Sequence, residues 1–241
     1  MSQKTVVIIP TYNEIENVRL IVEAILTRYP GFHVLIVDDN SKDGTIQEVE
    51  SLKKTFNHLS LICRRETVKG LGKSYITGMQ WALKNGMDRI VQMDADFSHD
   101  PAAIEALLQQ SESADVVVGS RYMSGTRVID WPLWRLILSK TANYYIRCVT
   151  GLPVFDCTSG FKCWNSRVLK AINLDTIRSE GYIFQVEMTY RAYKNGFSLV
   201  EFPIVFTERK RGHSKIWKSG LCESAVTPWK LVFSNQEITH K

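Results

Sequence analysis

The sequence predicts an α/β protein with a doubly wound, mostly parallel sheet and helices on both of its faces. Residues 5–119 alternate short β-branched runs with longer segments of helical spacing. The strand-like runs are continuously apolar, which is typical of parallel strands that helices cover on both faces. The chain has 241 residues, of which 44% are apolar and 23% charged. It is therefore long enough for one large domain and too apolar to be mostly disordered.

Five strands and four helices are expected to alternate along residues 5–119. The five predicted strands are the short apolar runs 5–9, 33–37, 59–63, 89–93 and 115–119. The first helix is predicted over 14–28, because apolar residues recur there at the spacing of one helix face. The other three are a polar helix that ends near 55, a helix over 73–84 that stops at an Asn-Gly pair, and a helix over 101–110 that starts with a proline.

The regular alternation fades after residue 120. We predict a helix over 131–151 with a broad apolar face, a helix over 181–194 and a strand over 201–206. Residues 215–233 are apolar and basic and carry tryptophans. We therefore expect residues 1–214 to form the main domain and residues 215–241 to form a C-terminal amphipathic, basic segment.

Acidic residues directly follow two of the predicted strands. Asp38 and Asp39 follow the second strand, and Asp94-Ala95-Asp96 follows the fourth. Open parallel sheets bind ligands outside the carboxyl ends of their strands, so we expect these carboxylates to share one crevice. Two carboxylates at this spacing suit Mg²⁺ or Mn²⁺, which commonly bridges a protein to substrate phosphates. Each aspartate alone would also fit a turn or a helix cap, and their convergence favours a site.

Basic residues that suit phosphate groups come later in the chain. Arg121 lies just past the fifth predicted strand. Arg135 and Ser139 are four residues apart in the next predicted helix and therefore share a face. Residues 209–215 form a basic loop that fits either a phosphate site or a solvated surface.

Several classes of protein are excluded. Residues 70–74 end like the phosphate-binding loop of P-loop NTPases, but Thr67 stands where that loop needs its first glycine. Tyr75 likewise stands where the glycine-rich motif of dinucleotide dehydrogenases needs its third glycine. The sequence therefore argues against both classes of enzyme. The net charge of +5 is too mild to indicate a nucleic-acid partner. No apolar run is long enough to span a bilayer and no signal core follows Met1, so we expect the chain in the cytoplasm.

Seven motifs resemble those of a known family of enzymes. Residues 10–14, 38–45 and 94–99 resemble the family 2 glycosyltransferases, which have the Rossmann-like GT-A fold. Four later segments narrow the resemblance to the polyprenol-phosphate (dolichol-phosphate) mannosyltransferases, and these are 119–122, 156–161, 181–187 and 206–215. The resemblance spans about residues 5–215, and the seven motifs together are far more specific than the first three.

The resemblance implies binding roles toward a nucleotide-sugar donor. The base and ribose would be held by Pro10, Tyr12, Glu14, Val37 and Asp39. The donor diphosphate would be met by Asp94, Ala95 and Asp96, and clamped by Arg209 and Lys215. A divalent cation, Mg²⁺ or Mn²⁺, would be bound by Asp94, Asp96 and Ser98.

The resemblance also implies an acceptor site and a reaction. Arg121, Arg135 and Ser139 would hold the phosphate of a lipid acceptor and, with Asp96, make up the catalytic set. The expected activity is the transfer of a hexose to polyprenyl (dolichyl) phosphate with inversion of the sugar. The expected hexose is mannose, and the expected donor is GDP-mannose. A phosphate monoester is largely dianionic near pH 7, because its second pKa is about 6, and it needs no general base. Glu187 is a candidate base, although pairing with a nearby arginine is the alternative interpretation.

Two other functions stay open from the sequence. One is a related transferase that uses UDP-glucose or another nucleotide sugar, or a hydroxyl acceptor. The other is a protein that binds a nucleotide sugar without catalysis, which the intact aspartate and basic sets disfavour.

A lipid acceptor requires contact with a membrane. Residues 131–150 and 215–233 carry aromatic and basic side chains along apolar faces, as interfacial helices do, although the same faces would also suit packing on the sheet. We expect the protein to associate peripherally with the cytoplasmic face of a membrane. It would do so on the membrane surface itself or through a small membrane-protein partner.

Overall fold

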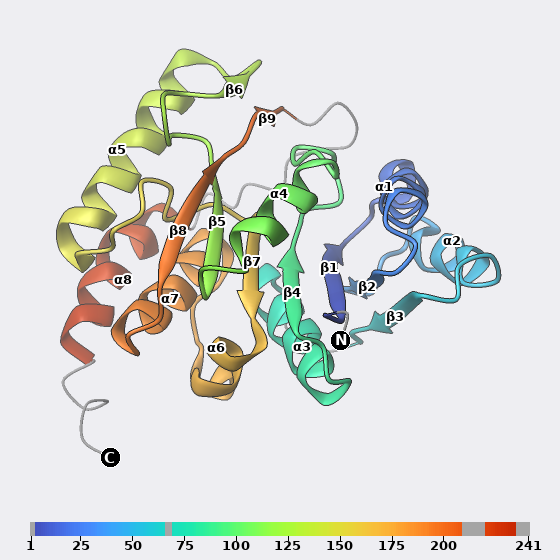
Figure 1. Ribbon diagram of the computed structural model, residues 1–241. Coiled ribbons are helices and arrows are strands. Elements are labelled where there is room, and N and C mark those ends of the chain that lie inside the picture. The colour runs from blue at the N-terminus through green and yellow to red at the C-terminus, as the bar shows by residue number, and fades with distance from the viewer. Residues whose placement is uncertain (1–2, 66–68, 209–219, 235–241) are drawn as a thin grey trace.

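A seven-stranded sheet forms the centre of the molecule. The computed structural model of the protein describes residues 3–65, 69–208 and 220–234. The strand order is β3-β2-β1-β4-β7-β5-β8 (Figure 1). The strands are β1 Thr5–Thr11, β2 His33–Asp38, β3 Leu59–Cys63, β4 Arg89–Gln92, β5 Val116–Ser120, β7 Lys162–Asn165 and β8 Leu199–Pro203. All five strands predicted for the first half of the chain are present, and the predicted α/β fold is confirmed.

One strand of the sheet was not predicted. β7 lies between β4 and β5 and runs antiparallel to both, whereas the other neighbouring pairs are parallel. Its four residues include a lysine and an asparagine, so it carries no continuous apolar run to read as a buried strand. The predicted strand over 201–206 is also wrong in its extent. β8 ends at Pro203, and β9 Phe206–Thr207 pairs instead with β6 Val128–Ile129 in a separate two-stranded sheet.

Helices cover both faces of the sheet, as predicted (Figure 1). Along β1, Val7 and Ile9 face α1, α2 and α4, while Val6 and Ile8 face α3, α6 and α7. This two-sided burial explains why the strands are apolar at every position. The helices are α1 Ile15–Arg28, α2 Thr45–Leu52, α3 Leu71–Lys84, α4 Ala103–Gln110, α5 Leu133–Thr150, α6 Ser166–Ala171, α7 Gly181–Lys194 and α8 Gly220–Ser234.

The last helix packs beside α5 and α7 (Figure 1). Leu231 of α8 is buried in the core on that side of the sheet, while Trp229 and Phe233 are exposed. The division into a main domain and a C-terminal segment from residue 215 stays a prediction. Within the described ranges, no helix combines the length and the apolar character needed to cross a membrane.

Candidate functional site

The predicted site residues come from strand ends at one edge of the sheet. The parallel strands β1, β2, β4 and β5 end there, followed by Tyr12, Asp39, Asp94 and Arg121 respectively. Because β7 is antiparallel, it starts from this same edge. The loop of residues 156–161 before β7 therefore lies at this edge too, which parallel topology alone would not have predicted.

Asp39 is fixed by three groups from the β3–α3 region. Its carboxylate accepts hydrogen bonds from Arg64 Nη1 at 2.5 Å, Ser74 Oγ at 2.9 Å and the Gly70 backbone N–H at 2.9 Å. Both Asp39 and Arg64 are buried, so this is a shielded ion pair. Arg64 was not predicted as a site residue. The sequence indicates it only through the two arginines, Arg64 and Arg65, that directly follow β3.

Asp38 has a structural role instead. Its carboxylate accepts from Thr11 Oγ1 at 2.7 Å and from both the backbone N–H and the hydroxyl of Ser41, at 2.7 and 2.6 Å. The side chain is completely buried. Asp38 therefore joins the loops after β1 and β2, whereas Asp39 faces the N-terminus of α3.

The remaining residues predicted for the base and ribose lie on the same two strand ends. Pro10 and Val37 are paired in register between β1 and β2. The Lys69 ammonium lies 3.9 Å from the centre of the Tyr12 ring. Glu14 accepts from Asn17 Nδ2 at 2.9 Å, and its backbone N–H donates to Thr45 at 2.9 Å. The structure thus places this predicted group at the ends of β1 and β2.

Asp94 and Asp96 occupy the turn after β4. The Asp94 side chain is 37% exposed and accepts a 3.4 Å hydrogen bond from the Tyr75 hydroxyl. Burial and the two aspartates raise the pKa of Tyr75 well above its ordinary value, so this phenol stays a donor. Asp96 is buried and accepts from the Ser98 backbone N–H at 3.1 Å. Ala95 lies buried between the two aspartates.

Gly160 lies next to the Asp94 carboxylate and carries no side chain that would contact it. A methyl group at this glycine would lie 3.5 and 3.6 Å from the two carboxylate oxygens and 3.8 Å from Gln185 Nε2. That amide nitrogen is buried and has no hydrogen-bond acceptor among the described residues. The two aspartates supply hard oxygen ligands on one turn, so the residues fit a divalent cation that takes its other ligands from a substrate. Within the described ranges, no three His, Cys, Asp or Glu side chains gather as a complete metal site.

His99 packs against the turn that carries Asp94 and Asp96. Its ring stacks on Phe161 at 5.0 Å between centres, and its Nδ1 accepts from the Asp94 backbone N–H at 3.4 Å. Complete burial lowers the pKa of His99, which favours the neutral ring that this acceptor role requires.

Arg121 is held in a buried ion pair at the end of β5. Its Nε and Nη2 donate to the two carboxylate oxygens of Asp156 at 2.7 and 2.6 Å, and Nη2 also donates to Thr158 at 2.9 Å. Burial alone would lower the pKa of the guanidinium, but the charge and hydrogen bonds of Asp156 outweigh it and raise that pKa. Arg121 is thus permanently charged, and Asp156 and Thr158 set its orientation.

Arg135 and Ser139 lie near Arg121 on the first turns of α5. The Arg135 guanidinium donates to Glu208 and lies 4.2 Å from the centre of the Trp131 ring. The Ser139 hydroxyl accepts from Tyr122 at 2.6 Å. Tyr122 directly follows Arg121, and the Arg121 guanidinium lies 5.5 Å from the same Trp131 ring. The predicted acceptor group is therefore assembled, with each polar side chain already hydrogen-bonded to a neighbour.

Three residues that the sequence analysis singled out remain, and these are Arg209, Lys215 and Glu187. Arg209 and Lys215 lie outside the described residues. Glu187 accepts from Arg191 Nη2 at 2.5 Å and from the Ser179 backbone N–H at 3.1 Å. The pairing with a nearby arginine is therefore confirmed as the environment of this carboxylate.

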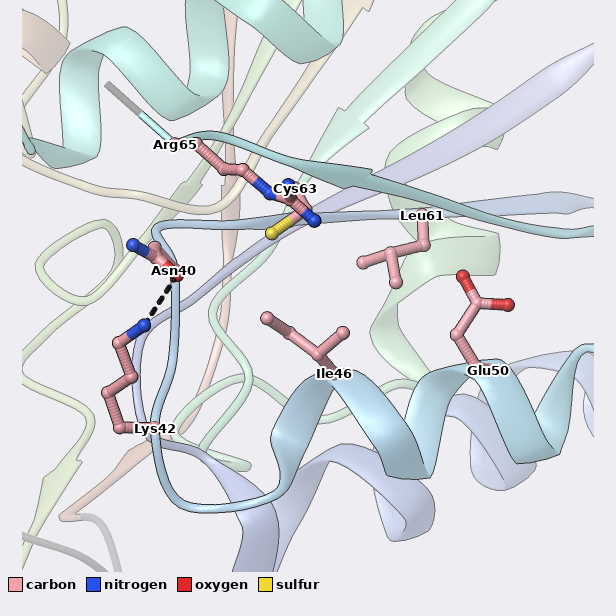
Figure 2. A pocket seen from close by; sticks show the side chains of 7 residues that line it. All are labelled: Asn40, Lys42, Ile46, Glu50, Leu61, Cys63 and Arg65. Atoms are coloured by element: carbon pink, nitrogen blue, oxygen red, sulfur yellow. Dashed lines mark hydrogen bonds between the residues drawn. The ribbon is translucent and has the colours of Figure 1, made fainter.

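A depression of about 510 Å³ lies apart from these residues, between α2 and the edge strand β3. Figure 2 shows Lys42 donating to Asn40 at one side of it and Glu50 on α2. Cys63 and Leu61 of β3 also line it. None of the predicted site residues lines this depression, so the candidate site stays at the strand ends.

The fold and this arrangement of residues define a glycosyltransferase. The family model described as Glycosyl transferase family 2 matches residues 6–172, and the chain belongs to this family. The chain is 44% identical over 233 residues to the polyprenol monophosphomannose synthase of Mycolicibacterium smegmatis, covering 95% of this chain and 88% of that protein. It is 40% identical over 231 residues to the undecaprenyl-phosphate mannosyltransferase of Micrococcus luteus, covering 95% and 94% respectively.

Solved structures agree on the fold. The crystal structure of glucosyl-3-phosphoglycerate synthase from Mycobacterium tuberculosis, in complex with Mn²⁺, uridine diphosphate and glucosyl-3-phosphoglycerate, is similar with a TM-score of 0.69. The match covers 97% of this chain and 80% of that one at 14% identity. At this identity the likeness supports the GT-A fold alone.

Proposed function

We propose that this glycosyltransferase moves a mannosyl residue from GDP-mannose to the phosphate of a polyprenyl phosphate. The proposal rests on two groups of residues, one acidic and one mainly basic, that lie at the same edge of the sheet. Asp94 and Asp96 occupy the turn after β4. Arg121, Arg135 and Ser139 lie beyond the end of β5. The high identity to two relatives named for mannose transfer to polyprenyl phosphates supports this choice of substrates.

The proposed reaction is a single displacement that inverts the sugar. A phosphate oxygen of the lipid forms the new bond to the anomeric carbon, and the bond from that carbon to the donor diphosphate breaks. The nucleoside diphosphate leaves with the electron pair. Because the attacking phosphate is already a dianion, no proton has to be removed, and the chain has only to align two anionic substrates.

Asp94 and Asp96 would hold a divalent cation, Mg²⁺ or Mn²⁺, with the Ser98 hydroxyl as a third proposed ligand. When bound, the cation would neutralise negative charge on the leaving diphosphate. Tyr75 and the Ser98 backbone N–H orient the two carboxylates.

The donor nucleotide would lie over the ends of β1 and β2. Pro10, Tyr12, Glu14 and Val37 would line its base and ribose next to Asp39. Arg64 and Ser74 keep the Asp39 carboxylate in one orientation, so a ligand would meet a preset acceptor. Arg209 and Lys215 are proposed to clamp the diphosphate.

The lipid acceptor would enter from the side of α5. Leu133, Trp134 and Ile137 of this helix are exposed, and so are Trp229 and Phe233 of the neighbouring α8. Exposed apolar and aromatic residues on adjacent helices suit the surface of a bilayer. We therefore propose direct contact with the membrane surface.

The first test is donor binding by calorimetry, with GDP-mannose and UDP-glucose compared with and without Mn²⁺. We expect tight, metal-dependent binding of GDP-mannose, followed by transfer of radiolabelled mannose to polyprenyl phosphate. Preference for UDP-glucose would contradict the choice of donor. Binding without any transfer would favour a non-catalytic protein.

A variant of Asp96 tests the proposed role of this residue in binding the cation. Asp96→Ala should abolish transfer while the circular dichroism spectrum and the melting temperature stay close to those of the wild type. Asp100→Ala, which changes an exposed aspartate four residues away, is the matched control and should keep activity. Full activity of Asp96→Ala would exclude the proposed metal role.

A further inference from the structure

Trp131 is held at a defined place between β6 and α5. Asp130 before it adopts a left-handed backbone with φ of 65°, and Pro132 after it is the N-cap residue of α5. A proline restricts the backbone of the residue before it to extended conformations. The main chain therefore restricts the direction in which the Trp131 side chain leaves the backbone.

The indole ring lies among the groups proposed to bind the acceptor phosphate. The guanidinium carbon of Arg135 is 4.2 Å from its centre, and that of Arg121 is 5.5 Å away. Phe206 of β9 packs edge-on against it at 5.4 Å. Two cations near an aromatic ring are a favourable arrangement, which holds the ring and both guanidiniums together.

The indole nitrogen of Trp131 has an unusual environment. Nε1 is buried, and no acceptor for it is found among the residues that the structure describes. An indole N–H can only donate, and a buried donor without an acceptor destabilises the folded state. Trp164 provides the contrast, because its buried Nε1 donates to Gln92 Oε1 at 2.6 Å. Within the described part of the chain, the N–H of Trp131 is therefore an unsatisfied donor, which an oxygen of a bound ligand would satisfy.

We propose that the Trp131 indole N–H donates a hydrogen bond to the phosphate of the lipid acceptor. The inference rests on the proposed function, since it needs an acceptor phosphate next to Arg121 and Arg135. A phosphate monoester presents three oxygens that accept hydrogen bonds strongly. The two arginines supply positive charge, and the indole adds a neutral, directional donor from the ring that both guanidiniums approach. Trp131 is then a binding residue that orients the attacking phosphate.

Two matched variants separate this role from packing. Trp131→Phe removes the N–H and keeps an aromatic ring, so KM for polyprenyl phosphate should rise about tenfold or more, as expected for a lost hydrogen bond to a charged group. KM for the nucleotide sugar should not change, and the melting temperature should not fall, because the variant loses a buried donor that has no acceptor among the described residues. Trp164→Phe removes a satisfied N–H, so it should lower the melting temperature and leave KM for the acceptor unchanged. An unchanged acceptor KM in Trp131→Phe would overturn the inference.

A spectroscopic readout makes the test independent of turnover. The chain has six tryptophans, and the Trp131 indole resonance in a ¹⁵N-labelled sample can be assigned as the one missing in Trp131→Phe. Farnesyl phosphate, a water-soluble isoprenyl phosphate, should move this resonance downfield, and farnesol should not. An equal response to both compounds, or none, would overturn the inference. If the wild type transfers no mannose, the proposed function fails, whereas the resonance still reports whether Trp131 meets the phosphate.

Discussion

Two buried ion pairs hold the functional arginines in place. Arg64 pairs with Asp39 on the donor side, and Arg121 pairs with Asp156 on the acceptor side. Each pair links a strand end to a loop from elsewhere in the chain. Removing one partner of such a pair leaves a buried charge uncompensated, so these pairs preserve geometry more than they add net stability.

Gly160 offers a test of the cation site proposed at Asp94. A methyl group there would be at ordinary contact distance from the Asp94 carboxylate, so Gly160→Ala should fold with nearly unchanged stability. It would occupy the space proposed for the cation. We expect Mn²⁺-dependent donor binding to weaken about tenfold or more, measured by calorimetry. Gly31→Ala, where an added methyl group meets nothing, is the control, and equal donor affinities of the two variants would contradict the prediction.

Lys162 is an ammonium group with no access to water. Its Nζ donates to the backbone oxygen and Oε1 of Gln185, at 3.1 and 3.0 Å. Burial lowers the pKa of Lys162 from 10.5 to about 7, and the charge of Asp156 only partly opposes this. Near pH 7 the folded chain therefore begins to release a proton that the unfolded chain retains.

The stability of the wild type should consequently rise with pH above 7. Between pH 7 and 8.5 the unfolded state binds more protons at Lys162, which adds up to ~1.4 kcal/mol of unfolding free energy per pH unit. Lys162→Met should lose this slope, and below pH 7 the slopes of the two proteins should converge. Urea unfolding at pH 6, 7, 8 and 8.5 measures both. Equal slopes above pH 7 would show that Lys162 keeps its ordinary pKa.

At the scale of elements, α3 depends on a close approach to the sheet. A methyl group at Gly78 would lie 2.6 Å from Ile8 Cγ2 on β1 and 3.3 Å from Val37 Cγ2 on β2. Helix and strands therefore touch at this glycine. The N-terminal turn of α3 carries Gly70 and Ser74, which hold Asp39, so the packing of the helix also positions the donor site.

Gly78→Ala should destabilise the protein although alanine favours helices. The gain of about 1 kcal/mol in helix propensity is opposed by overpacking against two buried strands, which costs about 1–3 kcal/mol. We expect a net loss of up to ~2 kcal/mol in urea unfolding, together with weaker donor binding. A more stable variant with normal donor affinity would show that α3 can shift without effect.

The sequence predicted elements well where apolar periodicity alone determines them. α7 was predicted with its observed ends, and the strands of the first half within two residues. β7 was missed because it is short, and because Lys162 is buried through hydrogen bonds that only the assembled fold provides. Part of the candidate site was missed for the same reason, because its residues come together only in the assembled fold. Asp39 and Asp94 follow strands directly, whereas Asp156 and Gly160 reach the crevice only through the antiparallel strand.

At the scale of the whole molecule, the exposed apolar residues are concentrated on one side. Leu133 is 70% exposed and Trp134 66%, both on the first turn of α5, and α8 runs beside that helix (Figure 1). Lys140 and Lys230 are exposed on the same two helices. This side combines apolar contact with positive charge, which suits an anionic lipid surface.

The combined change Leu133→Ser with Ile137→Ser should weaken binding to vesicles of anionic phospholipid by about tenfold or more, because two exposed side chains lose their burial in lipid. Stability should not change, since both residues are exposed. The matched control is Ile15→Ser with Leu20→Ser, which alters exposed residues of α1. Vesicle sedimentation measures the difference, and equal binding of the two double variants would exclude α5 as the docking face.

The antiparallel strand also sets the order in which the chain can fold. β4 and β5 follow one another closely in the sequence, yet the strand that joins them is β7, about forty residues beyond β5. During synthesis, both strands present unpaired edges until that segment emerges from the ribosome. Closure of long-range pairings is slow, and open edges attract other chains. A chain arrested before residue 160 should therefore aggregate, and the sheet should become protease-resistant only once residue 165 is free to pair.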